Sequence, residues 1–235
     1  MTRTIEALVE EQAHRWQLER ADHGGEARRP VITVSRQHGA RGGEVARQLA
    51  VELGLELYDR EILHRIAESA HLSERVVAAL DEKTRDLLTD WLTAVTGNAY
   101  LSPAEYHAYL RQVIAAVAER GGAVILGRGA HLILGEGRAL RVLVVAPLEA
   151  RVRTVQEREG LAERDARRRI VEVESERRAF LLKHFHTDFG DAAGFDVVVN
   201  TVALGVSGAV RSIEAALAGA PAAGRTAQSR STPAH

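Results

Sequence analysis

Cysteine is absent from all 235 residues of the chain. Its absence excludes disulfide bonds, thiolate zinc sites and cysteine nucleophiles, and it favours an intracellular location. Long hydrophobic runs are also missing, since no window approaches the roughly 20 apolar residues that a membrane-spanning helix needs. The N-terminal stretch is charged throughout and lacks the apolar segment of a secretory signal peptide. We therefore expect a cytoplasmic protein without a membrane partner.

The chain also has almost no net charge. The formal net charge is -1 although 27% of the residues are charged, so no global basic field indicates a nucleic-acid partner. Of the 31 basic residues only Lys83 and Lys183 are lysines, so positive charge is almost always carried by arginine. The hydrophobic fraction of 46% is enough for a buried core. Any anion site must therefore be local, and arginine must supply its charge.

Short apolar runs alternate with helical patterns along most of the chain. Buried parallel strands are expected at 31–35, 55–59, 123–127, 141–146 and 195–201. Helices are expected at 4–20, in a series over 60–95, and at 44–54, 102–122, 147–185 (broken near 159–165) and 207–219. This order predicts an α/β fold with a five-stranded parallel sheet flanked by helices. We assign 1–29 to an N-terminal helix and linker, 30–218 to the domain, and 219–235 to a disordered tail.

A glycine-rich loop joins the first strand to its helix. In "HGARGGEVA", Gly39, Gly42 and Gly43 allow backbone N–H groups and the helix N-terminus to point at phosphate oxygens. The Gly-Lys-Ser/Thr of a standard phosphate-binding loop is missing, so the glycines could also form only a tight turn. Arg36 and Arg41 flank the loop and could bring the charge that lysine would bring, with a different geometry.

Three stretches together resemble one known family. In order and spacing, "VITVSRQHGARGGEVARQLAVELG", "AVILGRGAHLIL" and "RVLVVAPLEARVRTVQER" with "FDVVVNT" are similar to the cytidylate kinase-like family, a divergent branch of the P-loop nucleoside monophosphate kinases. The resemblance covers roughly residues 31–215. Family members commonly carry S-R-x-x-G-S-G-G-x-E in this loop, also without lysine, whereas here Arg41 replaces a glycine.

The resemblance implies a fold and an activity. The fold is a P-loop kinase-like domain with a helical acceptor-binding insertion, at about 85–110, and an arginine-rich lid at about 147–190. The activity is transfer of the γ-phosphoryl group from ATP to CMP or dCMP, with Mg²⁺ as cofactor. Two alternatives stay open: a kinase of another small-molecule acceptor, and a catalytically inactive nucleotide-binding regulatory protein.

The resemblance also assigns residues to the donor nucleotide and to catalysis. The nucleotide-binding set is Ser35, Arg36, Gly39, Ala40, Arg41, Gly42, Gly43 and Glu44. The catalytic arginines are Arg41 in the loop and Arg151, Arg158 and Arg177 in the lid. Other lid arginines nearby are Arg153, Arg164, Arg167, Arg168 and Arg169. The alternative for most of them is a solvated helix stabilised by Glu–Arg pairs one turn apart.

Acceptor and metal are assigned to three further positions. Arg128, in "GRG" directly after an apolar strand, would grip the acceptor's phosphate, or it is an exposed turn arginine. Asp59 would orient an acceptor hydroxyl or a metal-bound water, or it caps the helix that follows. Glu44 occupies roughly the place of the magnesium-ligating Ser/Thr, where it would hold Mg²⁺ through water or favour the helix N-terminus.

The segment "KHFHTDFGD" suggests a metal site only superficially. His184 and His186 are two positions apart and face different sides of a helix, which argues against joint ligation with Asp188 and Asp191. The lid's aromatic positions, Phe180, Phe185 and Phe189, are instead expected to pack the lid against the domain.

Overall fold

A computed structural model describes residues 29–61, 63, 103–187 and 191–220 of the chain. The chain divides into two compact units, one comprising Met1–Arg28 and Glu61–Ile114, the other Arg29–Arg60 and Ala115–His235. The first unit is described mainly in the first part of α5 (Pro103–Arg120), which begins at its proline as expected. The predicted N-terminal helix, most of the helical series over 60–95 and the tail from 221 lie outside the described residues.

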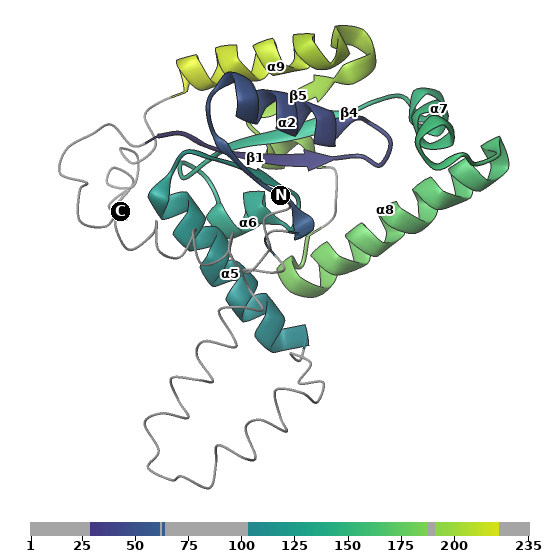
Figure 1. Cartoon of the computed structure of the whole chain (residues 1–235). Coiled ribbons are helices and arrows are strands. Elements are labelled where there is room, and N and C mark those ends of the chain that lie inside the picture. Colours follow the sequence, from purple (N-terminus) through teal and green to yellow (C-terminus); the bar gives the residue numbers. More distant parts are fainter. Residues whose placement is uncertain (1–28, 62, 64–102, 188–190, 221–235) are drawn as a thin grey trace, which may run out of the picture. The chain divides into compact units, whose positions relative to one another are not determined.

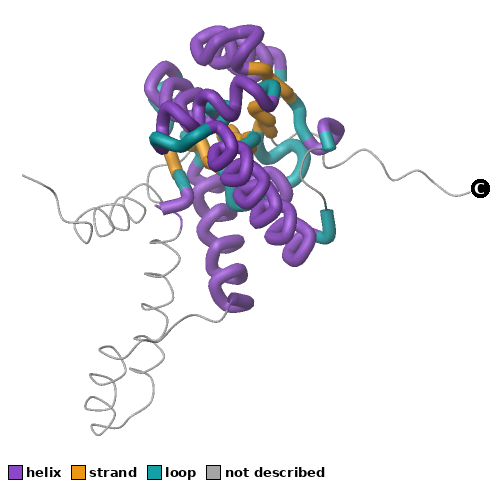
Figure 2. The backbone as a smooth tube through the Cα atoms, turned by 90° about the vertical axis from the view of Figure 1, so that its right-hand side faces the viewer, coloured by secondary structure: helices purple, strands orange, loops and turns teal. Residues whose placement is uncertain are grey.

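The second unit is built on one parallel sheet. Its strands are β1 (Val31–Arg36), β2 (Glu56–Tyr58), β3 (Ala123–Leu126), β4 (Leu140–Val145) and β5 (Val197–Asn200). They lie in the order β2-β3-β1-β4-β5, and each neighbouring pair is parallel. All five predicted strands and the α/β class are thereby confirmed, and Figure 2 shows the strands enclosed by helices.

The helices of this unit lie on both faces of the sheet. They are α2 (Gly42–Glu52), α6 (Ala130–Leu134), α7 (Leu148–Glu159), α8 (Glu163–Phe185) and α9 (Thr201–Gly219), with a short 3₁₀ turn at Ala192–Gly194. Helices α2 and α9 pack on each other over one face, and α6 contacts β1 from the other (Figure 1). The helix after β1 and the helix after β3 therefore leave the sheet on opposite faces.

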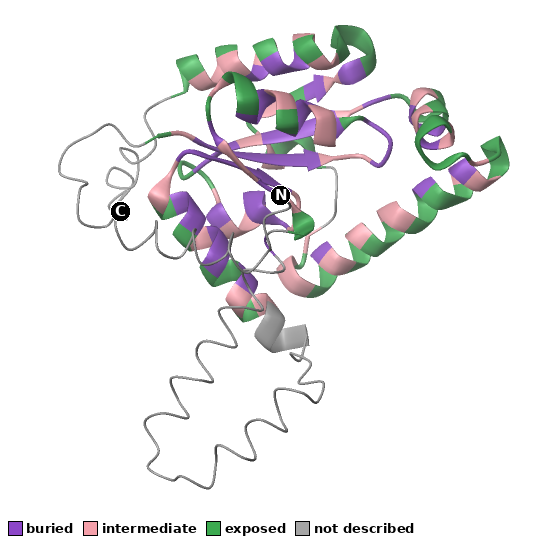
Figure 3. Cartoon of the chain, viewed as in Figure 1, coloured by how far each residue is buried: buried purple, intermediate pink, exposed green. Residues whose placement is uncertain are grey.

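The core lies between the sheet and the α2–α9 layer. Ile32 and Val142 of the central strands are fully buried, as are Val45 and Leu49 on one face of α2 and Ile213 of α9. Figure 3 shows the same buried strands at the centre of this unit. Each such aliphatic side chain contributes about 1.5–3 kcal/mol when removed from water. This apolar core fixes the strand ends, and with them the loops that follow.

The segment predicted as a lid, called the lid below, folds as a separate pair of packed helices. Helix α7 ends at Gly160, which adopts a left-handed conformation with φ 67°, and α8 begins three residues later, which confirms the predicted break. Val152 and Val155 of α7 pack on Ala166 and Ile170 of α8 in a small cluster of their own. The two helices thus hold each other by a hydrophobic seam distinct from the main core.

Most of the lid's surface charge is paired. Arg167 bonds to Glu163 one turn earlier on α8 and to Glu149 on α7. Arg168 is paired with Asp165 and Glu172 on its own helix. The solvated-helix alternative therefore describes these two arginines, of which Arg167 also joins α8 to α7.

Helix α9 starts six residues earlier than the pattern predicted. Asn200 caps it, and Gly205, with φ 68° and ψ 173°, kinks it near the expected start. At 19 residues and a mean hydropathy of 1.3, α9 also meets the length and composition of a membrane span, which corrects our statement that no stretch approaches these. It packs on α2, β4 and β5 with Ala209 and Val210 fully buried.

Replacing Asn200 with alanine is expected to lower the free energy of unfolding by about 1 kcal/mol. The Asn200 side chain accepts hydrogen bonds from the backbone N–H groups of Val202 and Ala203, at 3.0 and 3.4 Å. Alanine leaves both donors without this acceptor. Urea unfolding measures the loss, and Asn200→Ser, which keeps a capping oxygen, serves as the control. An equal loss in both variants contradicts a capping role.

Candidate functional site

The carboxyl ends of β1 and β3 form the place where a ligand is expected. These neighbouring strands end at Arg36 and Leu126, and their following helices, α2 and α6, lie on opposite faces of the sheet (Figure 1). In open α/β sheets such a divergence leaves a crevice beyond the strand ends, and ligands bind there. The topology alone therefore predicts a ligand site at this edge of the sheet.

A cavity of about 380 Å³ occupies this edge, a size typical of small-molecule sites. Among the described residues that line it, the charged and polar ones are Ser35, Arg36, His38, Arg60, Arg128, His131, Arg169, Glu176 and Arg177. Five arginines and one glutamate thus line the same space. Such a concentration of positive charge predicts an anionic ligand, since the arginines repel one another until an anion lies between them.

The pKa of Arg36 reflects its burial and the positive charges around it. Burial, followed by the neighbouring charges of Arg177 and Arg128, lowers the pKa of Arg36 to about 10. Its side chain crosses to the end of β3, where a Cβ placed on Gly127 would lie 2.1 Å from its Nη1 atom. Gly127 has φ 85°, and the Arg177 guanidinium donates to the carbonyl of Arg36 at 2.9 Å. A phosphate dianion between these side chains would relieve the repulsion.

Ser35 and His131 form a buried polar pair on the wall of the cavity. The Ser35 Oγ atom lies 3.2 Å from His131 Nδ1, and the imidazole stacks on Phe195 with ring centroids 4.7 Å apart. Burial, with a smaller effect from Arg141, lowers the pKa of His131 to about 4. The imidazole is therefore neutral at neutral pH, and this pair offers hydrogen bonds rather than charge.

The glycine loop has the form of a phosphate cradle. Gly39 has φ 82°, and a Cβ on it would lie 2.6 Å from the carbonyl oxygen of Arg151. A Cβ on Gly42, the first residue of α2, would lie 2.4 Å from Arg36 Cβ. The Glu44 N–H donates to the Arg41 carbonyl at 2.9 Å, whereas the N–H groups of Gly42 and Gly43 precede the first acceptor of the helix. The helix dipole makes this position favourable for an anion. Ala40 is buried, and its carbonyl accepts from the Thr201 hydroxyl at 3.0 Å, which anchors the loop.

Arg41 and Glu44 bind each other at the start of α2. Arg41 is the N-cap residue, with φ 58°, and its guanidinium donates to both Glu44 carboxylate oxygens at 3.0 and 2.7 Å. About half of each side chain is exposed, and neither lines the cavity. The hydrogen bond from Arg41 holds the pKa of Glu44 below its ordinary value, so the carboxylate is ionised.

Glu44 fits a magnesium contact through water. Mg²⁺ keeps several waters and is commonly held by one or two carboxylates together with the substrate's phosphates. No group of three or more His, Asp and Glu side chains that could form a protein-only metal site occurs within the described residues. Glu44 is exposed beside the first turn of α2 and would exchange its bond to Arg41 for the metal's hydration shell.

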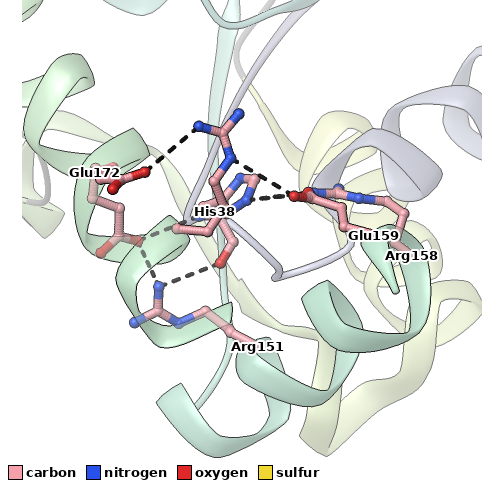
Figure 4. Close-up of polar contacts among 7 residues, drawn as sticks. His38, Arg151, Arg158, Glu159 and Glu172 are labelled. Carbon is pink, nitrogen blue, oxygen red and sulfur yellow. Dashed lines mark hydrogen bonds and ion pairs between the residues drawn. The ribbon is translucent and has the colours of Figure 1, made fainter. Parts of the chain in front are cut away.

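Arg151 and Arg158 hold the lid to the loop. Arg151 is buried, and its Nη1 atom donates to Glu174 of α8 at 2.5 Å and to the carbonyl of His38 at 3.3 Å. Arg158 bonds to Glu159, and its Nη2 atom lies 3.4 Å from His38 Nε2. Figure 4 shows His38 between Arg151 and the Arg158–Glu159 pair. Both arginines are bound to carboxylates, and neither lines the cavity.

Some of the predicted site residues line the cavity, others lie in the loop beside it, and others point elsewhere. The structure brings Ser35, Arg36, Arg128 and Arg177 together in the cavity. It places Gly39, Ala40, Gly42 and Gly43 in the loop beside it. Arg41 and Glu44 point elsewhere, and Asp59, which follows β2, lies close enough to Arg36 to raise its pKa.

Sequence reasoning did not assign four of the arginines and histidines that line the cavity to the site. Arg60 follows Asp59 at the end of β2, His38 lies inside the glycine loop, His131 belongs to the first turn after "GRG", and Arg169 is a lid residue that we had not singled out. Arg60 and His38 come two residues after strands that end at one sheet edge, and His131 lies in α6, the helix after β3. Placement after a strand could therefore have identified them, whereas the facing of Arg169 depends on how α8 packs.

Two phenylalanines near the end of α8 pack, one against the Arg128 turn and one beside the cavity. A Cβ on Gly129 would lie 2.7 Å from the Phe185 ring, so Phe185 rests on the turn that carries Arg128. Phe180 lies 6.2 Å from Phe185 between ring centroids and lines the cavity. Asp188 and Phe189 lie outside the described residues.

Comparisons with known proteins agree with this geometry. The sequence model of the cytidylate kinase-like family matches residues 31–203. The chain is 25% identical over 184 residues to a cytidylate kinase of Ignicoccus hospitalis, covering 78% of this chain and 96% of that protein. It is 27% identical over 180 residues to a cytidylate kinase of Aeropyrum pernix, covering 72% and 87%. In fold it is similar to an uncharacterized protein of Eubacterium ventriosum, with a TM-score of 0.58, 18% identity, and coverage of 79% and 99%.

Proposed function

The chain belongs to the cytidylate kinase-like family, and on this premise we propose that it transfers the γ-phosphoryl group of ATP to CMP or dCMP in the cytoplasm. The observation that carries the proposal is the cavity at the carboxyl ends of β1 and β3, where five arginines converge beside a glycine loop. The similarity to two cytidylate kinases supports the choice of acceptor. Phosphoryl transfer depends mainly on positioning and on neutralising charge, and these residues suit both tasks.

The donor and acceptor phosphates would meet at the junction of loop and cavity. The first turn of α2 and the glycine loop would hold the donor's phosphates through backbone N–H groups. Arg128 would bind the acceptor's phosphate from the end of β3, with Arg36 beside it. Arg177, which donates to the carbonyl of Arg36, would lie between the two and stabilise the charge on the transferring group.

Mg²⁺, three further arginines and Asp59 would contribute once the nucleotide is bound. Mg²⁺, held through Glu44 and the phosphates, supplies charge neutralisation to the donor when it is bound. Arg41 and Arg158 would complete the positive field after exchanging their carboxylate partners for phosphate oxygens, and Arg151 would add its charge while it keeps its bond to Glu174. Asp59, beside Arg36, would orient an acceptor hydroxyl.

An assay of ATP consumption across nucleoside monophosphates tests the proposal. With MgATP and a panel of CMP, dCMP, UMP, AMP and GMP, we expect a nucleoside diphosphate to accumulate with CMP or dCMP, identified by mass. The kcat/KM for the preferred acceptor is expected to reach at least about 10⁴ M⁻¹s⁻¹, the lower end for an enzyme on its substrate.

Other outcomes of the same assay separate the rival functions. A product with none of the nucleotides, together with turnover of another small phosphorylated or hydroxylated acceptor, indicates a kinase of different specificity. Tight binding of ATP without product from any acceptor contradicts the proposed reaction and indicates a nucleotide-binding regulatory protein.

A further inference from the structure

The glycine loop carries three basic side chains, and they point in three directions. Arg36 crosses to the end of β3 and packs against Gly127. Arg41 turns outward and binds Glu44. His38 faces α7 and α8 and lines the cavity. Since the loop has no lysine, His38 is the loop side chain placed between the phosphate cradle and the lid.

The backbone of His38 is clamped by the lid helices. Its N–H group donates to Glu174 Oε1 at 3.3 Å, and its carbonyl accepts from Arg151 Nη1 at 3.3 Å. Arg151 and Glu174 are themselves joined at 2.5 Å. This closed set of bonds holds the backbone of His38, and the side chain it carries lines the cavity.

The imidazole is held in an environment that opposes its charged form. Its Nε2 atom lies 3.4 Å from Arg158 Nη2 and 3.8 Å from Glu159 Oε1. Burial, followed by the charges of Arg177 and Arg158, lowers the pKa of His38 to about 4. The charged groups that face it from the two packed helices are Arg151, Arg158 and Glu159 of α7 and Arg169, Glu174 and Arg177 of α8. Positive groups outnumber carboxylates in this set.

We propose that His38 contacts the terminal phosphate of the nucleotide held by the loop and takes up a proton as that phosphate binds, so that it supplies the positive charge that the missing lysine would bring. This inference rests on the proposed function, because it requires a phosphate in the loop. It assigns a phosphate-binding role to a residue of this chain's own loop.

A bound phosphate would change the surroundings of the imidazole so that they favour its protonated form. A phosphate dianion screens Arg158 and Arg177 and adds negative charge beside the ring, so the pKa of His38 rises on binding. In the neutral ring Nε2 can accept from Arg158, whereas in the imidazolium both nitrogens carry hydrogen and can only donate. Protonation therefore ends the contact with Arg158 and makes this arginine available to the phosphate.

The direction of the pH dependence follows from the two pKa values. Because the pKa is about 4 in the free protein and higher in the complex, binding takes up a proton between these values. The gain in MgATP affinity that His38 provides is then largest at a pH near the pKa of the free protein. It is lost as the pH rises through the pKa of the complex. Its slope reaches up to about tenfold in affinity per pH unit.

Titration calorimetry with MgATP measures the proton directly. The binding enthalpy is recorded from pH 5.5 to 8.5 in buffers of different ionisation enthalpy, for the full chain and for His38→Gln. The terminal phosphate of ATP titrates in the same range, so the difference between the two proteins is the readout. We expect the ratio of wild-type to variant affinity to rise as the pH falls, with extra proton uptake in the wild type. His131→Gln, which removes the other neutral imidazole of the cavity, is expected to retain that uptake.

Each outcome decides the proposal. Equal proton uptake in the wild type and His38→Gln overturns the role of His38 while the proposed kinase function stands. Loss of the uptake in His131→Gln alone transfers the role to His131 and overturns it equally. If the wild type binds no MgATP at any pH, the proposed function and this inference both fail. A thermal unfolding scan of each variant separates these results from a failure to fold.

Discussion

Replacing Arg128 with alanine is expected to lower kcat/KM for the phosphoryl acceptor about 100-fold, which corresponds to about 3 kcal/mol, while the affinity for ATP changes by less than about twofold. Arg128 follows β3 and lines the cavity, and its proximity lowers the pKa of Arg36. Removing one guanidinium from the acceptor's phosphate loses a charge-assisted bond and leaves the phosphate incompletely paired. The donor is held by the loop, so its binding is independent of this arginine.

Steady-state kinetics with each substrate varied in turn measures the effect. Arg138→Ala is the matched control, because Arg138 is about half exposed in the segment before β4 and does not line the cavity. Arg128→Lys keeps the charge but not the planar fork, and we expect it to recover only part of the loss. An unchanged acceptor KM and kcat in Arg128→Ala, with a folded protein, removes this residue from the acceptor site.

Replacing Gly39 with alanine is expected to lower the free energy of unfolding by about 2–4 kcal/mol and the affinity for ATP at least about tenfold. With φ 82°, alanine incurs about 1–2 kcal/mol of backbone strain at this position. The new Cβ would also lie 2.6 Å from the Arg151 carbonyl oxygen and 2.9 Å from its Cβ. Backbone atoms of α7 cannot move aside as a flexible side chain can, so the loop itself must shift. Its N–H groups would then no longer point at the phosphates of ATP.

Gly54→Ala is the control for strain alone. Gly54 also has a positive φ, of 60°, but a Cβ on it meets no atom within 4 Å. We expect a loss of about 1 kcal/mol in urea unfolding and unchanged ATP binding by calorimetry. Equal losses of stability in the two variants, or wild-type ATP binding by Gly39→Ala, would contradict a close loop–lid contact at Gly39.

The strands and helices could be predicted because their causes are local. Runs such as "VITVS" and "RVLVVA" are apolar and β-branched, and burial on both faces of a parallel sheet requires this composition. The break in the lid could be predicted because Gly160 ends α7 in a left-handed conformation. The start of α9 could not, since Asn200 caps a first turn that continues across the kink at Gly205.

The candidate site could be predicted only in outline. Ser35 and Arg36 end β1 and Arg128 follows β3, so their place at the sheet edge follows from the order of elements. The direction of each arginine side chain could not be predicted, because its length allows it to reach several different partners. Which partner it binds depends on which carboxylate lies nearby in the folded chain. Arg41 beside Glu44 and Arg151 beside Glu174 are the two examples.

The sequence by itself determined the layered α/β fold, the position of the glycine loop between the first strand and its helix, and the absence of a lysine from that loop. These properties depend on residues that are neighbours in the chain or repeat at a regular spacing. Only the tertiary structure decided which arginines converge on one cavity, which are neutralised by carboxylates, and that His38 faces the lid. Electrostatic interactions act between groups far apart in the chain, so their outcome depends on how α7 and α8 pack beside the sheet.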